Sequence, residues 1–285
     1  MIPAEFDYVA PTTLQEAIAA LGEAGEDAKI LAGGQSLIPV LRLRLSFPTV
    51  LIDLSKVDEL RGVRDDGDAI VIGAMTKHSD VIQDPLVRQY AALVAEATGT
   101  VADPAVRHRG TFGGALAHAD PAGDLAAVAL ALDAELVAEG PAGRRTIKAS
   151  EFFLDYLETA LSPDEILAAV RVPKREGWGV RYEKFNRVAQ AWAIVAVATA
   201  VRMEGGAIAE ARIGLTNMGS TPVRPAATEA ALVGATSLAQ IKQASASAAD
   251  GTNPPSDLGA QADYRQHLAR VLTARAVAHA AGISS

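Results

Sequence analysis

The stretch Lys29-Ile30-Leu31-Ala32-Gly33-Gly34-Gln35-Ser36 joins a short apolar run to two adjacent glycines and a serine. The run Lys29–Ala32 is typical of a buried strand, and glycines directly after a strand favour a tight turn. Before it, Thr13-Leu14-Gln15-Glu16 forms a capping box that begins a helix ending near Gly25. After it, Val50–Leu54 has the pattern of a second strand. The N-terminal region is therefore predicted to be a small α/β unit.

The sequence that follows mixes strands and helices in the same way. We expect strands at Ala69–Gly73, Glu135–Ala138 and Glu165–Val172, and helices at Pro85 to about Thr98 and at Leu125–Leu132. The segment Pro173–Gly177 is charged, bracketed by proline and glycine, and without periodicity. It is the best candidate for a domain boundary.

Beyond this boundary the pattern changes to an antiparallel sheet followed by helices. We expect strands at Val180–Phe185, Ile194–Met203 and Ala207–Leu215, with Glu204-Gly205-Gly206 as a hairpin turn. Alanine-rich helices follow, interrupted by the turn-forming loop Asp250–Asp257. The fold class predicted for the chain is α+β.

Composition excludes several classes of function. The chain has 285 residues and a formal net charge of −8, which disfavours nucleic acid as a partner because phosphates require a basic surface. It has no cysteine, so it can form no disulfide, use no thiolate and hold no iron–sulfur cluster by cysteine. Any such cluster must belong to another chain.

We also expect a cytoplasmic protein without an integral membrane segment. The sequence Met1–Asp7 carries acidic residues where a signal peptide would have a basic region. The longest apolar stretch, Ala191–Val201, is much shorter than the roughly 20 residues that a membrane helix needs.

Familiar catalytic motifs are absent. The chain contains no GxGxxG, GxxxxGK[ST], GxSxG or HExxH pattern, and its five histidines show no metal-ligand spacing. A Rossmann site, a P-loop, a hydrolase nucleophile elbow and a metal centre are therefore not expected.

A second glycine loop, Gly110-Thr111-Phe112-Gly113-Gly114, resembles the first in chemistry. In each loop, adjacent glycines leave backbone amides open to an anion, and a hydroxyl side chain stands beside them. Either loop alone is more simply a tight turn. Together they could hold the two phosphates of a dinucleotide from opposite sides, with the carboxylate of Asp124 downstream to accept hydrogen bonds from a ribose.

Longer stretches in the same order resemble one family, the flavoprotein or medium subunits of molybdenum hydroxylases, which include carbon monoxide dehydrogenase and relatives of xanthine dehydrogenase. The stretches are Ala32–Pro39, Ile72–Thr76, Asp103–Gly114, Ala119–Asp124, Tyr182–Phe185 and Gly214–Arg224. They cover nearly the whole chain.

The resemblance implies an FAD-binding domain of the p-cresol methylhydroxylase (PCMH) type, with two α/β subdomains, over residues 1–176. The C-terminal domain of these flavoproteins would follow over residues 177–285. It further implies that two loops hold the FAD pyrophosphate, that Asp124 lies near the adenosine half and that Lys184 lies near the isoalloxazine. The residues of the two loops are Ala32, Gly33, Gly34, Gln35 and Ser36, and Thr111, Phe112, Gly113, Gly114 and Ala115. Gln35 stands where some members of the family have histidine, Ala115 where many have asparagine or aspartate, and Phe112 where isoleucine is commoner.

The implied function is electron transfer within an oxidoreductase. A large partner would carry the molybdenum cofactor, a small partner the [2Fe–2S] clusters, and the assembly would be a dimer of heterotrimers. FAD on this chain would pass electrons to an external acceptor, and no catalytic residue for the organic substrate is expected here. Two alternatives stay open: a self-contained flavin-dependent oxidoreductase, and a non-catalytic assembly or ligand-binding module.

Simpler roles are possible for individual residues. Asp124 could cap the helix that begins near Leu125, and Lys184 could be a solvated lysine on a strand. Trp178 and Trp192 are expected to contribute packing rather than flavin stacking. Because no cysteine is present, FAD is expected to be bound noncovalently.

Overall fold

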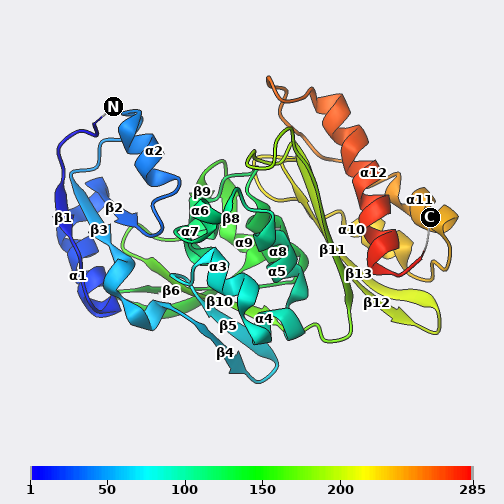
Figure 1. The fold of residues 1–285 in the computed structure, drawn as a ribbon, viewed down its shortest axis with the longest axis horizontal. Coiled ribbons are helices and arrows are strands. Elements are labelled where there is room, and N and C mark those ends of the chain that lie inside the picture. Colours follow the sequence, from blue (N-terminus) through cyan, green and yellow to red (C-terminus); the bar gives the residue numbers. More distant parts are fainter. Residues whose placement is uncertain (1, 284–285) are drawn as a thin grey trace.

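The computed structural model describes residues 2–283, which form three units in a row along the long axis of the molecule (Figure 1). A small N-terminal unit lies at one end, a sheet with helices occupies the middle, and a second sheet with helices lies at the other end. None of the helices within residues 2–283 combines the length and apolar character needed to cross a membrane.

The N-terminal unit is a parallel sheet in the order β1-β3-β2. Its strands are β1 (Asp7–Val9), β2 (Ala28–Leu31) and β3 (Val50–Asp53), and its helices are α1 (Leu14–Ala24) and α2 (Leu37–Arg42). The predicted capping box is present: the Glu16 amide donates to Thr13 Oγ1 at 3.1 Å and the Thr13 amide to Glu16 Oε2 at 3.3 Å. The helix packs its apolar side chains Leu14, Ile18 and Leu21 into the local core.

The middle unit is built on a five-stranded antiparallel sheet in the order β4-β5-β10-β6-β7. Its strands are β4 (Val63–Asp66), β5 (Ala69–Gly73), β6 (Glu135–Gly140), β7 (Gly143–Lys148) and β10 (Ile166–Pro173), and β8 (Phe153–Asp155) pairs with β9 (Glu158–Thr159). Its helices are α3 (His78–Gln83), α4 (Pro85–Tyr90), α5 (Ala92–Gly99), α6 (Pro104–Arg107), α7 (Phe112–His118), α8 (Asp124–Ala131) and α9 (Ala149–Phe152). Every residue of α8 is buried, so this helix forms the centre of the molecule.

The helix predicted from Pro85 to Thr98 is wrong in one respect. The backbone leaves the helical region at Ala91, with φ −139° and ψ 47°, and divides the segment into α4 and α5. The break lets α4 contact β4 and β5 while α5 contacts α8 and β11. A continuous helix could not follow both surfaces.

The C-terminal unit confirms the predicted antiparallel sheet. Strands β11 (Gly179–Phe185), β12 (Val195–Glu204) and β13 (Ala207–Thr216) pair in sequence order, and Gly205 and Gly206 form the hairpin turn with positive φ. One face of the sheet carries α12 (Ala262–Ala280), which in turn packs on α11 (Leu238–Ser245); α10 (Ala226–Leu232) packs on β13. The other face packs on α5 and α8 of the middle unit.

The contact between the middle and C-terminal units is extensive and includes charged groups. Side chains of β12 share one apolar core with α5 and α8. At its edge the carboxylate of Asp133 pairs with three arginines, Arg175 at 3.2 Å, Arg212 at 3.5 Å and Arg224. The two units therefore hold a defined relative orientation.

Candidate functional site

The first glycine loop presents a row of backbone donors. Residues Ala32–Ser36 connect β2 to α2, and Gly34 has φ +73°, which favours glycine. The amides of Gly33, Gly34, Gln35 and Ser36 find no hydrogen-bond acceptor within residues 2–283. Successive free N–H groups in such a turn form a concave surface that suits an anion.

The second loop is held differently. Its backbone pairs with Ala74–His78, the segment that follows β5: Gly113 N donates to Ala74 O at 2.9 Å, Phe112 N to Thr76 O at 2.9 Å, and His78 N to Gly110 O at 3.0 Å. Thr111 caps α7 by accepting from the Gly114 amide at 3.2 Å. The amides from Phe112 to Gly114 are thus engaged within the chain, and the expectation that both loops offer free amides is wrong for this one.

The two loops touch each other. A Cβ atom built on Gly33 would lie 2.7 Å from Gly110 Cα and overlap the carbonyl of Arg109, and one built on Gly114 would lie 3.2 Å from Ala32 Cβ. Such distances leave no room for a side chain at Gly33. The loops therefore form one continuous backbone surface, rather than facing each other across a gap at this point.

His78 supports this surface from behind. Its ring is 3% exposed and lies against Gly110, where a Cβ atom would come within 2.8 Å of Cδ2 and 3.1 Å of Nε2. Burial, and secondarily the charge of Arg107, lowers the pKa of His78 to about 4, so the ring is neutral near pH 7. Its Nδ1 atom has no hydrogen-bond partner among the described residues.

Asp124 and Lys184 form a buried ion pair. Lys184 Nζ lies 2.8 Å from Asp124 Oδ2 and donates to Thr100 O at 3.1 Å, while the Tyr182 hydroxyl donates to Asp124 Oδ1 at 2.7 Å. The side chains of Lys184 and Asp124 are 6% and 3% exposed. Burial raises the pKa of Asp124, against the opposing effects of Lys184 and Tyr182, and burial also raises the pKa of Tyr182 well above its ordinary value.

The structure bears on three expectations about these residues. Lys184 is not a solvated lysine, because it is buried against a carboxylate. Asp124 is the first residue of α8 rather than its cap, which is Gly123. Asp124 and Lys184, which were expected near different halves of FAD, have their charged atoms in direct contact.

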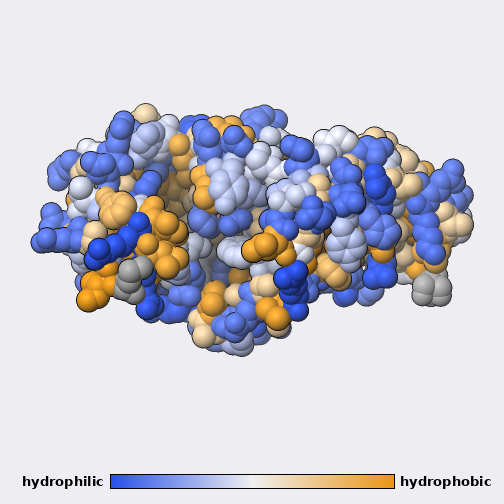
Figure 2. Space-filling view, turned by 90° about the horizontal axis from the view of Figure 1, so that it is seen from above, coloured by the Kyte–Doolittle hydropathy of each residue, from blue (hydrophilic) through white to orange (hydrophobic). Residues whose placement is uncertain are grey.

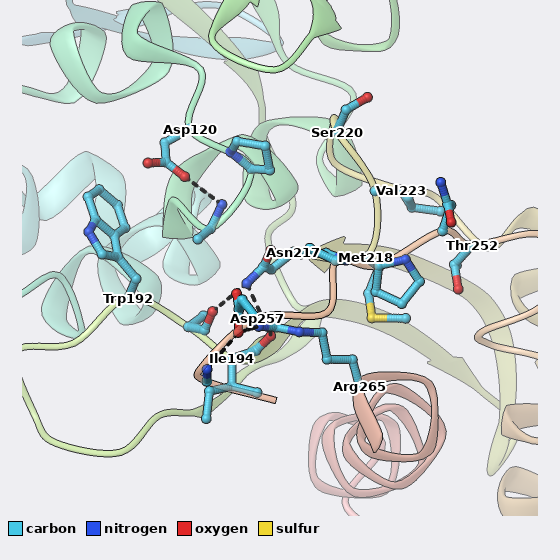
Figure 3. A pocket seen from close by; sticks show the side chains of 18 of the residues that line it. Asp120, Trp192, Ile194, Asn217, Met218, Ser220, Val223, Thr252, Asp257 and Arg265 are labelled. Atoms are coloured by element: carbon cyan, nitrogen blue, oxygen red, sulfur yellow. Dashed lines mark hydrogen bonds and ion pairs between the residues drawn. The ribbon is translucent and has the colours of Figure 1, made fainter. Parts of the chain in front are cut away.

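A cavity of about 1200 Å³ lies between the middle and C-terminal units (Figure 3). The turn Asp120–Ala122, the segment Ala191–Ile194 and the loop after β13 line it. Trp192 is 54% exposed, and its ring lies 3.8 Å from a Cβ position on Gly123. A packing role is therefore correct for Trp178, which lies against the core, and wrong for Trp192, which lines a cavity.

One hydrogen bond beside this cavity connects the two units, and others hold the C-terminal unit together. Asn217 N donates to Pro121 O at 2.8 Å and Asn217 Nδ2 to Ala193 O at 2.8 Å. Arg265, which is 1% exposed, donates to Ile194 O and forms a two-point ion pair with Asp257 at 2.8 Å (Figure 3). None of these residues was selected from the sequence, although Asn217 lies in the stretch Gly214–Arg224 that resembles the family.

A second cavity, of about 580 Å³, is lined by other residues of the segment Asn186–Ala193. Lys184, Tyr182, Thr100 and Arg107 are among the residues that line it. Ile194 N donates to Phe185 O at 2.8 Å, and this hydrogen bond joins the two ends of the segment Asn186–Ala193. Within residues 2–283 no group of three or more His, Cys, Asp or Glu side chains is arranged to bind a metal.

Two of the remaining site candidates, Gln35 and Ala115, are exposed, and a third, Phe112, is buried. Gln35 is exposed, and its Nε2 donates to Gly33 O at 3.3 Å. Ala115 is exposed on α7, whereas Phe112 is 2% exposed and packs in the core. Phe112 therefore contributes its backbone and its packing to this surface, but not an accessible side chain.

Comparisons with known proteins agree over the whole chain. Residues 4–175 match the family described as FAD binding domain in molybdopterin dehydrogenase, and residues 180–280 match the CO dehydrogenase flavoprotein C-terminal domain. The carbon monoxide dehydrogenase medium chain of Hydrogenophaga pseudoflava is 42% identical over 279 residues, 97% of each chain. The caffeine dehydrogenase subunit beta of a Pseudomonas species is 37% identical and covers 99% of this chain and 96% of that one.

Solved structures give the same result. A chain of carbon monoxide dehydrogenase from Hydrogenophaga pseudoflava superimposes with a TM-score of 0.96 at 44% identity, covering 98% of each chain. A chain of quinoline 2-oxidoreductase from Pseudomonas putida 86 gives a TM-score of 0.94 at 33% identity, covering 99% of each. The resemblance noted in the sequence is confirmed: this chain belongs to the family of FAD-binding medium subunits of molybdenum-containing dehydrogenases and hydroxylases.

Proposed function

We propose that this chain binds one FAD noncovalently, receives electrons from [2Fe–2S] clusters on a partner chain and passes them to an external acceptor. The observation that carries the proposal is the row of four free amides from Gly33 to Ser36, set against the second glycine loop. Flavin can accept electrons one at a time and deliver them as a pair. A bound flavin could therefore link one-electron [2Fe–2S] clusters to a two-electron acceptor.

The loops would bind the pyrophosphate in different ways. Gly33, Gly34, Gln35 and Ser36 would donate backbone hydrogen bonds, with the Ser36 hydroxyl beside them, and Ala32 would leave the approach open. Thr111, Phe112, Gly113, Gly114 and Ala115, whose amides from Phe112 to Ala115 are already paired within the chain, would supply a closely packed wall without bulky exposed side chains beside this row of donors. Gly33 fits this arrangement because its hydrogen atom is all that the contact with Gly110 allows.

We assign both Asp124 and Lys184 to the isoalloxazine end of the site. The cavity next to Lys184 is also lined by Arg107 and Arg181, and it lies between residues 99–107, which end α5 and form α6, and residues 181–190 of β11 and the segment after it. Lys184 would stabilise negative charge on the pyrimidine side, and Asp124 would orient Lys184 and moderate its charge. Tyr182 would fix the carboxylate through its 2.7 Å hydrogen bond.

The proposal extends to the assembly. A large chain would hold the molybdenum cofactor and a small chain the iron–sulfur clusters, in a dimer of heterotrimers; the absence of cysteine from this chain fits such a division. The FAD-binding domain would span residues 1–176 and the C-terminal domain residues 177–285, which is supported by the two family matches. A cytoplasmic location, which cell fractionation would test, belongs to the same proposal.

The test is to purify the chain with the chains that bind it and to record absorption before and after acid precipitation. We expect FAD in the supernatant at one per chain, together with iron–sulfur absorption from a partner. Flavin retained in the pellet would contradict noncovalent binding. Substrate oxidation by the isolated flavoprotein would favour a self-contained oxidoreductase, and failure to bind flavin in the complex would favour a non-catalytic module.

A further inference from the structure

The cavity beside Lys184, of about 580 Å³, contains a cation to which the proposed function gives no role. Arg107, the last residue of α6, lines this cavity together with Lys184 and Arg181. Lys184 is paired with Asp124 at 2.8 Å. Arg181 is paired with Glu183, also at 2.8 Å. Arg107 forms no ion pair within residues 2–283. Hydrophilic side chains cover much of the molecular face shown in Figure 2, so a charge by itself marks no site, but an unpaired one in this cavity does.

One nitrogen of Arg107 holds a strained turn. Nη1 donates to Val101 O at 2.8 Å and to Ala102 O at 3.2 Å. Ala102 has φ +41°, in the left-handed region that a residue with a side chain rarely adopts. Such a conformation persists only where the surrounding contacts impose it, and it occurs often at functional sites. The two hydrogen bonds from Arg107 are contacts of this kind.

The same turn connects Arg107 to Lys184. Lys184 Nζ donates to Thr100 O at 3.1 Å. Three successive carbonyl groups, at positions 100, 101 and 102, therefore accept hydrogen bonds from two cations. Arg107 belongs to α6 of the middle unit, and Lys184 belongs to β11 of the C-terminal unit. The turn thus fixes the two cations relative to each other where the two units meet.

The other nitrogens of Arg107 are available to a ligand. Nε and Nη2 donate to no group among the described residues, and neither atom is fully buried. The carboxylate of Asp103 also lines the cavity, but it accepts from the Val106 amide at 2.9 Å and from Gln190 Nε2 at 2.5 Å. Asp103 therefore does not engage the Arg107 guanidinium, which offers a positive charge and free donors to a molecule in the cavity.

We propose that Arg107 is a second cation at the flavin, which donates from Nε or Nη2 to the isoalloxazine while its Nη1 holds the turn at Ala102. This inference rests on the proposed function, because it takes the place of the isoalloxazine from it. Reduction adds negative charge to the pyrimidine side of the flavin, and a guanidinium stays protonated at neutral pH. Because Asp124 balances the charge of Lys184, the unpaired Arg107 would contribute more to the preference for reduced flavin.

The test is spectroelectrochemical titration of FAD in the purified complex with Arg107→Gln, Arg107→Lys and the control Arg64→Gln. For Arg107→Gln we expect at least a tenfold loss of the preference for reduced over oxidised FAD, which corresponds to a potential about 30 mV lower for two electrons. Arg107→Lys keeps the charge without the planar guanidinium and should lie between Arg107→Gln and wild type. Arg64→Gln removes the same charge at an exposed position on the edge strand β4 and should leave the potential unchanged.

Several outcomes would overturn the role of Arg107. Coincident potentials for Arg107→Gln and wild type would do so, and so would an equal shift in Arg64→Gln. Equal potentials for the Gln and Lys variants, both below wild type, would assign the effect to the turn and refute the flavin contact. If Arg107→Gln loses FAD, Arg107→Lys decides, and a potential identical to that of wild type refutes the proposal. A wild-type complex without FAD would instead contradict the proposed function itself.

Discussion

Lys184 and Asp124 are sixty positions apart in the sequence, yet their charged atoms are 2.8 Å apart in the interior. The opposite charges of the pair nearly cancel. Because the two side chains are almost fully buried, removal of either one would leave a poorly screened charge in the interior. In the proposed site beside the isoalloxazine, Lys184 would stabilise the negative charge of reduced flavin and Asp124 would destabilise it.

This opposition gives a prediction about redox potential. Lys184→Met leaves the carboxylate of Asp124 unbalanced and should lower the two-electron potential of FAD, whereas Asp124→Asn leaves the ammonium unbalanced and should raise it. We expect shifts on the order of 30 mV or more, equivalent to about 1.4 kcal/mol for two electrons. Spectroelectrochemical titration at equal flavin occupancy measures both. The double variant should lie between them, and coincident potentials would remove the pair from the flavin site.

The contact between the loops predicts a severe effect at Gly33. Gly33→Val would push the first loop away from Arg109 and Gly110, so we expect loss of FAD binding in a fluorescence titration. Gly206→Val is the control: it has φ +81° in a hairpin turn with open space around it, so it should cost about 1–3 kcal/mol of stability and leave FAD binding intact. Retention of flavin at full stoichiometry by Gly33→Val would refute the role of this contact.

The packing of His78 on Gly110 predicts that their sizes are coupled. Gly110→Ala should weaken FAD binding by about tenfold or more, because the added methyl group meets the imidazole ring and displaces the second loop. His78→Ala should restore part of the affinity in the double variant by making room for that methyl group. Isothermal titration of FAD into the four proteins of the cycle measures the coupling. Purely additive effects would show that the ring does not set the loop position.

His78 also predicts a pH dependence of stability. Its pKa falls from 6.5 in the unfolded chain to about 4 in the folded one, so the stabilisation is complete above pH 6.5 and is lost as pH falls from 6.5 towards 4. The full effect is about 3 kcal/mol. Urea unfolding at pH 7 and pH 4.5 should show a smaller difference for His78→Phe than for wild type. An equal pH dependence in His78→Phe and wild type would show that His78 does not cause this loss of stability.

Local signals in the sequence predicted much of the fold. The capping box at Thr13, the strand Ala69–Gly73 and the hairpin at Gly205 and Gly206 each depend on neighbouring residues, and each is present. The break at Ala91 was not predictable in this way, because alanine continues a helix by propensity. It is imposed by two separate packing surfaces, one on β4 and β5 and the other on α8 and β11.

The sequence motifs of the site were predictable, but the tertiary contacts between them were not. The glycine loops were identified from composition, but engagement of the Gly113 amide by Ala74 depends on a tertiary contact. The Asp124–Lys184 pair and the exposure of Trp192 depend likewise on how β11 and the following segment pack against α8. Spacing along the sequence carries no information about such distances.

The ion pairs of Asp133 at the contact between the two domains limit how those domains can be exchanged between related proteins. One carboxylate of the middle unit serves Arg175, Arg212 and Arg224, and a Cβ atom on Gly214 of β13 would overlap the Ala127 carbonyl of α8. A chimera that joined the first domain of this chain to the second domain of a distant relative would have to match both features at once. Exchange of single domains between relatives should therefore fail more often than exchange of whole chains, and substitutions at positions 133, 175, 212 and 224 should be inherited together.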